Sequence, residues 1–270
     1  MSDNVKTVAL FNDLCGMGRC SLSVAIPIVS AFGLQPIPVP TALLSCHTGY
    51  ENFSFTDFTP YFSDYIASLK KQSQSIDAVY TGFVGSYYEL DDIINYIKSA
   101  NKFLLVDPVM GDNGKAYSTY TGQMCSKMKE LVAFSDVTTP NLTEACILTD
   151  TEFKSEFSDD EIKSIAKKVC SLGAKACVIT GIVSGDFIKT YVYADGLSQF
   201  VVYPKTEIMY DGTGDIFASV LCGGLLKGKS LLDAVDCACG FVSKTTKYTM
   251  ALGTPQIDGI AFEPLLKELL

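Results

Sequence analysis

The sequence has little positive charge. It contains 21 lysine and arginine residues against 30 aspartate and glutamate residues, which gives a net charge of −9. Nucleic acids and anionic membranes repel such a chain, so neither is expected as a partner. No apolar run reaches the roughly 18 residues that cross a bilayer, and no cationic and apolar leader opens the chain. We therefore expect a cytoplasmic protein.

The ten cysteines lack the spacing of a metal site or a disulfide framework. Cys237 and Cys239 are separated by one residue, and no second pair completes a zinc site. Cys146, Cys177 and Cys222 lie within apolar runs, where cysteine behaves as a small hydrophobic residue. The thiols are therefore expected to be reduced and mostly structural.

Short apolar runs alternate with helical patterns along almost the whole chain. Runs typical of buried parallel strands are found at residues 7–11, 76–83, 103–106 and 176–181. Two further runs, 191–193 and 199–203, flank Asp195-Gly196, and this pattern predicts an antiparallel hairpin. No linker or repeat divides the chain. The sequence predicts a single doubly wound α/β domain over residues 1–270, with its site at the carboxyl edge of a mostly parallel sheet.

The first part of the chain is expected to alternate strands with polar loops. The first strand is predicted to end at Phe11, followed by Asn12-Asp13. Residues 37–40, which include two prolines, are predicted to form an edge strand. Residues 41–56 are expected to form a loop that carries His47, the single histidine of the chain. On spacing alone, a lone histidine is more often a packed or solvated residue than a catalyst.

The segment from Tyr210 to Leu226 reads as a glycine turn that leads directly into an apolar helix. Gly212 and Gly214 permit backbone conformations that a β-carbon would obstruct. The free N–H groups and the dipole of a helix N-terminus favour an anion, most often phosphate. Asp215 could then accept the proton of a hydroxyl group that attacks a phosphoryl group. It could equally be a carboxylate that only stabilises the first turn of the helix.

Two carboxylates follow the apolar run 103–106. Asp107 lies at the end of this predicted strand and Asp112 shortly after it, where open α/β sheets bind ligands. Two acids near a phosphate site indicate magnesium, bound directly or through water. The alternative is that Asp107 and the proline after it only form a turn.

Asn141 and Glu144 stand at the start of a predicted helix. Asparagine is a good N-cap, and a glutamate three residues later completes a capping box. This local pattern alone does not distinguish a capping role from a functional role.

Two glycine motifs are rejected as nucleotide sites. Residues 223–230 match GxxxxGK(S/T), but a helical pattern precedes them where a phosphate-binding loop needs a strand. Gly228 is predicted to end that helix and Ser230 to cap the next one. The motif at Gly16 and Gly18 has Ser21 in place of the third glycine of a dinucleotide fingerprint, which argues against nicotinamide binding.

Five segments resemble, in their order along the chain, the ribokinase-like superfamily and, within it, the vitamin B6 kinases: Asn12-Asp13, 47–50, 107–112, 139–144 and 212–215. Gly-Thr-Gly-Asp at 212–215 and Thr-Pro-Asn-x-x-Glu at 139–144 are typical of the superfamily. His-Thr-Gly-Tyr at 47–50 and Asp-Pro-Val-Met-Gly-Asp at 107–112 resemble the B6 branch. The resemblance covers nearly the full chain. It implies a three-layer α/β/α fold and transfer of the γ-phosphate of ATP to the 5′-hydroxymethyl group of pyridoxal, pyridoxine or pyridoxamine.

The resemblance also implies a role for each matching residue. Asp215 would be the catalytic base and Gly212, Thr213 and Gly214 the anion hole. The phosphates, the nucleotide and Mg²⁺ would lie near Asp107, Asp112, Asn141, Glu144 and Thr180, with Asp107, Asp112 and Glu144 as metal ligands. The substrate ring would face Asp13, His47, Thr48, Phe83 and Tyr117, of which Tyr117 matches a flap that excludes water. Relatives of this kind are commonly homodimers, and a monovalent cation at the anion hole is left open.

Three positions depart from the B6 kinase pattern. Asp13 stands where many B6 kinases have serine, Cys46 where they have asparagine, and Phe83 where a tyrosine often contacts the substrate. An aspartate against the ring is closer to the hydroxymethylpyrimidine kinases of thiamin synthesis, which are the alternative reading. A ligand-binding protein without turnover is a more distant alternative, and the intact Asp215 argues against it.

Overall fold

The computed structural model describes residues 5–72 and 75–269. Within these residues nine strands form one sheet in the order β11-β10-β9-β8-β5-β4-β1-β2-β3, and β6 and β7 form a separate hairpin. The neighbouring strands β2, β1, β4, β5, β8 and β9 are parallel to one another. Strands β3, β10 and β11 are antiparallel to their neighbours. The strands are β1 (Thr7–Met17), β2 (Gln35–Cys46), β3 (Phe55–Asp57), β4 (Ala78–Thr81), β5 (Phe103–Val106), β6 (Gly111–Asp112), β7 (Lys115–Ala116), β8 (Val137–Thr138), β9 (Ala176–Ser184), β10 (Phe187–Ala194) and β11 (Leu197–Pro204).

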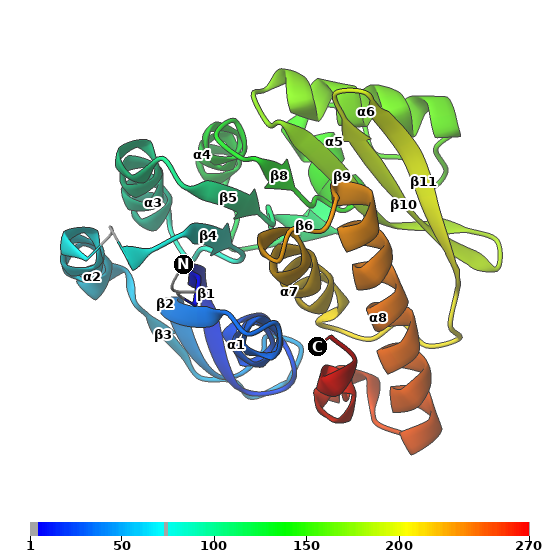
Figure 1. Cartoon of the computed structure of the whole chain (residues 1–270), viewed down its shortest axis with the longest axis horizontal. Coiled ribbons are helices and arrows are strands. Elements are labelled where there is room, and N and C mark those ends of the chain that lie inside the picture. Colours follow the sequence, from blue (N-terminus) through cyan, green and yellow to red (C-terminus); the bar gives the residue numbers. More distant parts are fainter. Residues whose placement is uncertain (1–4, 73–74, 270) are drawn as a thin grey trace.

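Two layers of helices cover the two faces of the sheet (Figure 1). Helices α2 to α6 pack on one face, and α1, α7, α8 and η3 pack on the other. The helices are α1 (Ser21–Ala31), α2 (Thr59–Lys71), α3 (Tyr87–Ala100), α4 (Gly122–Val132), α5 (Leu142–Leu148), α6 (Asp159–Ser171), α7 (Thr213–Leu226), α8 (Leu231–Leu252), η2 (Gln256–Asp258) and η3 (Glu263–Leu269). The predicted three-layer doubly wound fold is confirmed, and the extent of one domain over 1–270 stays a prediction. In the described part of the chain, no helix combines the length and apolarity needed to span a membrane.

The core lies on both faces of the central strands, which explains their continuous apolar runs. On β1, Ala9 and Phe11 point into the cluster under α2 to α6, while Val8 and Leu10 point into the cluster under α1, α7 and α8. All four side chains are fully buried. Polar groups can therefore emerge only at the strand ends, and this is where the candidate site lies.

The prediction that the first strand ends at Phe11 is wrong. Strand β1 continues to Met17 alongside β2, and its register shifts between Asn12 and Leu14. Two residues of β2, Thr41 and Ala42, lie opposite the single residue Asp13 of β1, so the extra residue of this bulge belongs to β2. Asp13 thus lies inside a strand, opposite the bulge, and is not a loop residue after it.

The prediction of one loop over residues 41–56 is also wrong. Strand β2 runs through residues 41–46, and β3 pairs with it in antiparallel orientation. Ala42 and Leu44 are buried whereas Leu43 is exposed, which is the alternation of a strand with one covered face. Residues 37–40 pair with β1 alone, so this part of β2 does lie at an edge, as predicted.

The rejection of a phosphate-binding loop at residues 223–230 is confirmed. Gly223 lies inside α7, where an added β-carbon would lie 2.2 Å from the ring of Phe32. Gly228 follows the end of α7, and the Ser230 hydroxyl accepts the N–H of Asp233 at 3.2 Å as the N-cap of α8. The segment connects two helices, as the helical pattern indicated.

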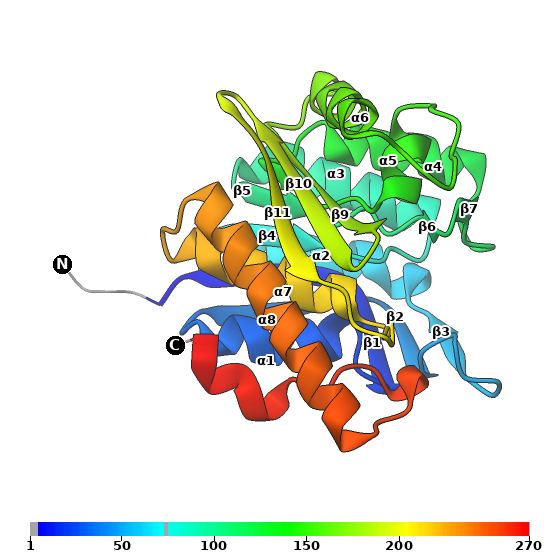
Figure 2. The ribbon, with the colours of Figure 1, turned by 90° about the vertical axis from the view of Figure 1, so that its right-hand side faces the viewer.

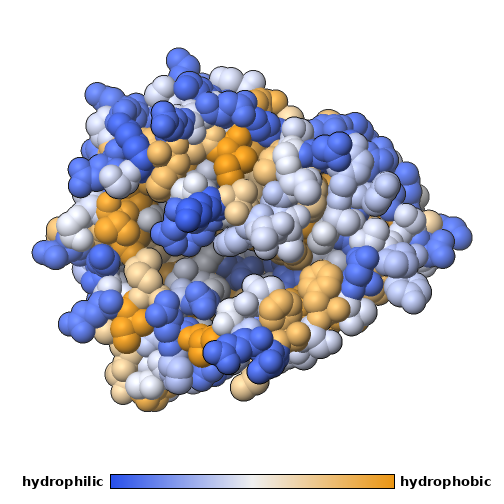
Figure 3. Space-filling view, turned by 180° about the vertical axis from the view of Figure 1, so that it is seen from behind, coloured by the Kyte–Doolittle hydropathy of each residue, from blue (hydrophilic) through white to orange (hydrophobic). Residues whose placement is uncertain are grey.

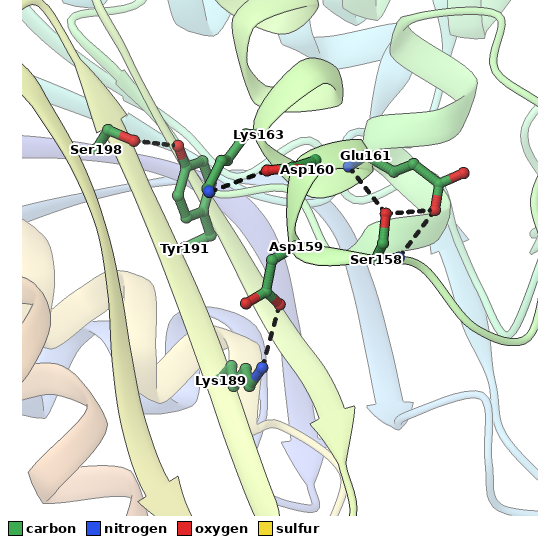
Figure 4. A network of polar contacts seen from close by, with 8 residues as sticks. All are labelled: Ser158, Asp159, Asp160, Glu161, Lys163, Lys189, Tyr191 and Ser198. Atoms are coloured by element: carbon green, nitrogen blue, oxygen red, sulfur yellow. Dashed lines mark hydrogen bonds and ion pairs between the residues drawn. The ribbon is translucent and has the colours of Figure 1, made fainter.

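The predicted hairpin over Asp195-Gly196 is confirmed, and Figure 2 shows its strands β10 and β11 beside α8. One side chain of β10, Lys189, pairs with Asp159 of α6 at 3.1 Å, and the hydroxyl groups of Tyr191 and Ser198 lie 2.7 Å apart (Figure 4). Asp159 lies in the first turn of α6, where a carboxylate is favoured. The ion pair joins the hairpin to α6, whereas the contact of Tyr191 with Ser198 joins the two strands of the hairpin.

A carboxylate in the first turn of α3 is fully buried beside the start of α2. Glu89 is 0% exposed, and its carboxylate accepts the hydroxyl of Thr59 at 3.2 Å and the N–H of Gly85 at 3.0 Å. Burial raises the pKa of Glu89 from 4.5 to about 7, because desolvation disfavours the charged form more than these donors favour it. The native state therefore binds this proton more tightly than the unfolded chain does.

The stability of the protein should therefore respond to pH through Glu89. Its contribution is complete below the unfolded pKa of 4.5 and is lost as the pH rises through the folded pKa of about 7. The variant Glu89→Gln keeps an acceptor without the charge, so it should gain stability relative to the parent between pH 5 and pH 8. Urea unfolding of both proteins at the two pH values measures this change. A stability difference that is independent of pH would contradict the raised pKa.

Candidate functional site

A cavity of about 410 Å³ opens at the carboxyl edge of the sheet. Figure 3 shows the molecule hollowed near the centre of one face, with hydrophilic surface around the hollow. The cavity lies between the loops after β5 and β8, the hairpin β10–β11, and the N-terminus of α7. It is lined by most of the predicted site residues, namely Asp107, Asp112, Tyr117, Asn141, Glu144, Thr180, Gly212, Thr213, Gly214 and Asp215.

The N-terminus of α7 is open to this cavity. Gly212 is the N-cap, and within the described chain no side chain caps the helix. The N–H groups of the first turn have no partner inside the helix, so they can serve a ligand. Gly212 has φ 76, and an added β-carbon would lie 2.0 Å from the carbonyl oxygen of Arg19. A β-carbon at Gly214 would meet nothing within 4 Å, because that position faces open space.

Asp215 lies in the first turn of α7 and meets the N-terminus of α1. The N–H of Ser21, the first residue of α1, donates to its carboxylate, and the amide of Asn12 donates to Oδ1 at 3.3 Å. Ser21 adopts φ 55, which is unusual for a residue other than glycine. Burial first, and then the charge of Asp13, raise the pKa of Asp215 to about 6.

Asp107 and Glu144 form an acidic pair across the cavity floor. Asp107 is 7% exposed and accepts the hydroxyl of Thr139 at 3.1 Å. Burial and the charge of Asp215 raise the pKa of Asp107 to about 7. Burial and the charge of Asp107 raise the pKa of Glu144 well above its usual range. Such a pair favours a cation or a proton, because like charges in a desolvated site destabilise each other.

Glu144 also completes the predicted capping box of α5, which is confirmed. The N–H of Asn141 donates to its Oε2 at 2.8 Å, and the amide oxygen of Asn141 accepts the N–H of Glu144 at 2.9 Å. The other carboxylate oxygen accepts the N–H of Met110 at 3.1 Å, and the Asn141 amide donates to the Gly111 carbonyl at 2.9 Å. The cap of α5 therefore also fixes the loop that carries Asp107 and Asp112.

Four predicted substrate residues do not line this cavity. Asp13 is 6% exposed and accepts the thiol of Cys15 at 3.1 Å, and burial raises its pKa. Phe83 packs edge-to-face on Tyr120, with ring centroids 6.2 Å apart. Thr48 is exposed in the loop after β2. His47, the fourth, lies in the same loop.

Both ring nitrogens of His47 are already engaged. Its Nε2 lies 2.7 Å from the carbonyl oxygen of Ile257, and its Nδ1 accepts the N–H of Gly49 at 3.2 Å. The neighbouring Tyr50 hydroxyl donates to Asp258 at 2.7 Å. In this arrangement His47 connects the loop after β2 to the 256–258 segment.

Asn12 is a site residue that we did not predict. Its side chain is 1% exposed and contacts Asp215, although the two residues are 203 positions apart in the chain. One signal was available, because a polar residue at the end of an apolar strand needs buried hydrogen-bond partners. Its partner, however, depends on the folded arrangement of β1 and α7.

The residues present are compatible with a magnesium ion that is held mainly by the phosphate groups of a bound substrate. Among the described residues, no three acidic, histidine or cysteine side chains converge as a ready metal site. Mg²⁺ usually keeps several waters and binds one or two carboxylates together with substrate phosphates. From the described residues, the Asp107 carboxylate accepts one side-chain hydrogen bond, from Thr139, so it retains capacity for such an ion.

The first turn of α7 carries the Asp215 carboxylate beside N–H groups that no side chain of the described residues caps, an arrangement compatible with phosphoryl transfer to an alcohol. With the sheet order and the antiparallel strands at its ends, this makes the molecule a kinase of the ribokinase-like class. Residues 28–258 match the family described as phosphomethylpyrimidine kinase, and the chain belongs to this family. It is therefore a phosphotransferase that acts on a hydroxyl group.

Three similar proteins illustrate the range of the family. A phosphomethylpyrimidine kinase homologue from Bacteroides thetaiotaomicron, crystallised with pyridoxal, is 36% identical, covers 98% of this chain and 96% of its own, and has a TM-score of 0.93. The pyridoxal kinase of Arabidopsis thaliana is 31% identical over 74% of this chain and 68% of its own. The hydroxymethylpyrimidine/phosphomethylpyrimidine kinase of Aquifex aeolicus is 29% identical over 82% of this chain and 87% of its own.

The two glycines of the turn should fail in different ways when changed to alanine. Gly212→Ala forces a side chain into the Arg19 carbonyl at a positive φ, so it should destabilise the fold by more than about 1 kcal/mol. Gly214→Ala should keep the parent stability and lose phosphotransfer, because its methyl group enters the open cavity. Thermal melting and steady-state assays of both variants measure the two effects. Equal loss of stability in both would contradict this division.

Proposed function

We propose that this protein transfers the γ-phosphoryl group of ATP to the hydroxymethyl group of a B6 vitamer: pyridoxal, pyridoxine or pyridoxamine. The observation that carries the proposal is the Asp215 carboxylate in the same helix turn as backbone N–H donors that no side chain of the described residues caps. Similarity to pyridoxal kinases and to a homologue crystallised with pyridoxal supports the choice of alcohol.

In this mechanism Asp215 is the general base. Its pKa of about 6 keeps it mostly ionised at neutral pH, yet close enough to accept a proton as the hydroxyl oxygen attacks. The N–H groups at Thr213 and Gly214 would face the transferred phosphoryl oxygens, where negative charge develops. Thr180, on the far side of the cavity, would contact the nucleotide, and Tyr117 would close over the reacting groups to exclude water.

The charge of the cavity supports a requirement for magnesium. None of the described residues that line the cavity is a lysine or arginine. Four carboxylates line it, those of Asp107, Asp112, Glu144 and Asp215. A bound Mg²⁺ would be held by Asp107 and, directly or through water, by Asp112 and Glu144, and would neutralise phosphate charge. A homodimer is also proposed, and sedimentation analysis tests it.

The identity of the alcohol has one specific alternative. The family match and the Aquifex aeolicus relative favour hydroxymethylpyrimidine as substrate, and so does the carboxylate at Asp13. Although Asp13 is buried and does not line the cavity, it lies close enough to raise the pKa of Asp215, so a substrate amine or ring N–H that reached Asp13 would lie near the base. Within the B6 vitamers, this arrangement favours pyridoxamine.

Removal of the base tests the mechanism. Asp215→Asn keeps the size of the side chain but cannot accept the proton, so turnover should fall by about 10²-fold or more. ATP binding, measured by calorimetry, should persist because the N–H groups of the turn remain. Unchanged turnover in this variant would show that Asp215 is not the base.

Competition among alcohols tests the substrate. In one assay with pyridoxal, pyridoxine, pyridoxamine and hydroxymethylpyrimidine, kcat/KM should be highest for a B6 vitamer, with pyridoxamine first. Asp13→Ser should reduce the preference for pyridoxamine over pyridoxal, because it removes the charge that pairs with the amine. Equal values for all four alcohols would refute the role of Asp13, and a clear preference for hydroxymethylpyrimidine would favour the thiamin alternative.

A further inference from the structure

Asn12 connects three parts of the site through a single buried side chain. Its Oδ1 accepts the N–H of Phe83 at 2.8 Å and the N–H of Asp13 at 3.0 Å, and its Nδ2 donates to Asp215 at 3.3 Å. The side chain is 1% exposed. One amide therefore links Asp13 of β1, the loop after β4 and the first turn of α7.

The orientation of this amide is fixed by its partners. Two backbone N–H groups can be satisfied only by the oxygen of Asn12, so the NH₂ group has to face Asp215. The amide also packs against Gly82, where an added β-carbon would lie 2.4 Å from its Nδ2 atom. The space beside Asn12 thus depends on glycine at position 82.

We propose that Asn12 is a positioning residue, which holds the carboxylate of Asp215 in line with the substrate hydroxyl and ties it to the loop that carries Phe83. This proposal rests on the proposed function, in which Asp215 is the base. Asn12 acts through Asp215 and the backbone and need not touch the substrate. Because a displacement of about 1 Å can cost 10²-fold in rate, a fixed carboxylate matters more than the energy of one hydrogen bond.

The variant Asn12→Asp separates the donor from the acceptor. It keeps an oxygen for the N–H groups of Phe83 and Asp13, but at pH 8 it places a second carboxylate, rather than a donor, against Asp215. We expect kcat to fall by about 10- to 100-fold, while KM for ATP and for the alcohol stays near the parent value. Asn12→Ala removes the acceptor as well, so it leaves the N–H groups of Phe83 and Asp13 without this partner and should also lower the melting temperature.

A matched control is available on the surface of α3. Asn95 donates to Asp91 at the same distance of 3.3 Å, but this pair is exposed and neither residue lines the cavity. Asn95→Asp introduces the same change of charge, and kcat should stay within about twofold of the parent. This control separates the effect of position from that of added negative charge.

A double-mutant cycle with Asp215→Asn decides whether Asn12 works through the base. If it does, Asn12→Asp lowers kcat in the parent and causes no further loss in the Asp215→Asn background. An equal loss in both backgrounds, or no loss in the parent, would overturn the positioning role while the base assignment stands. Full turnover of Asp215→Asn itself would refute the proposed base and, with it, the role of Asn12.

A second variant guards against failure to fold. Gly82→Ala pushes the Asn12 amide from the β4 side without changing either hydrogen-bonding residue. Thermal melting of both variants shows which one folds. Where Asn12→Asp does not fold, Gly82→Ala is expected to lower kcat with KM for ATP unchanged, and parent-like kcat in a folded Gly82→Ala protein would contradict the proposal.

Discussion

A carboxylate that is largely removed from water is stable only where fixed dipoles face it, and the region around Asp215 is organised by this requirement. Asp215 lies in the first turn of α7, receives the N–H of Ser21 at the start of α1, and receives the amide of Asn12 from β1. Two consecutive elements near the start of the chain, β1 and α1, therefore meet α7 at one charge. The register shift between β1 and β2 and the positive φ of Ser21 both lie beside this point of contact.

On the opposite wall of the cavity, backbone N–H groups also hold a carboxylate, that of Glu144. Glu144 uses both carboxylate oxygens for backbone N–H groups, one in the capping box of α5 and one at Met110. The acidic loop after β5 is thereby held in place without any basic side chain. A cavity built in this way presents rigid negative charge on one side and helix N–H groups on the other, which suits an anionic ligand that arrives with its own cation.

Local patterns predicted much of this structure, because they are set by neighbours in the chain. The parallel strands, the hairpin, the start of α7 and the capping box at Asn141 all follow from residues within one or two turns of each other. The course of β1 after Phe11 could not be predicted, because it depends on pairing with β2 across a bulge. The contact of Asn12 with Asp215 likewise exists only once β1 and α7 are packed. His47 was expected to face the substrate, and its hydrogen bond to Ile257 is a long-range contact of the same kind.

The two glycines before Asp215 are constrained by different surroundings. The fold itself requires glycine at position 212, because the backbone there is left-handed and lies against the Arg19 carbonyl. Gly214 is demanded only by whatever occupies the open space in front of it. In a descendant of this chain that no longer met its ligand, position 214 would be free to drift while position 212 stayed glycine.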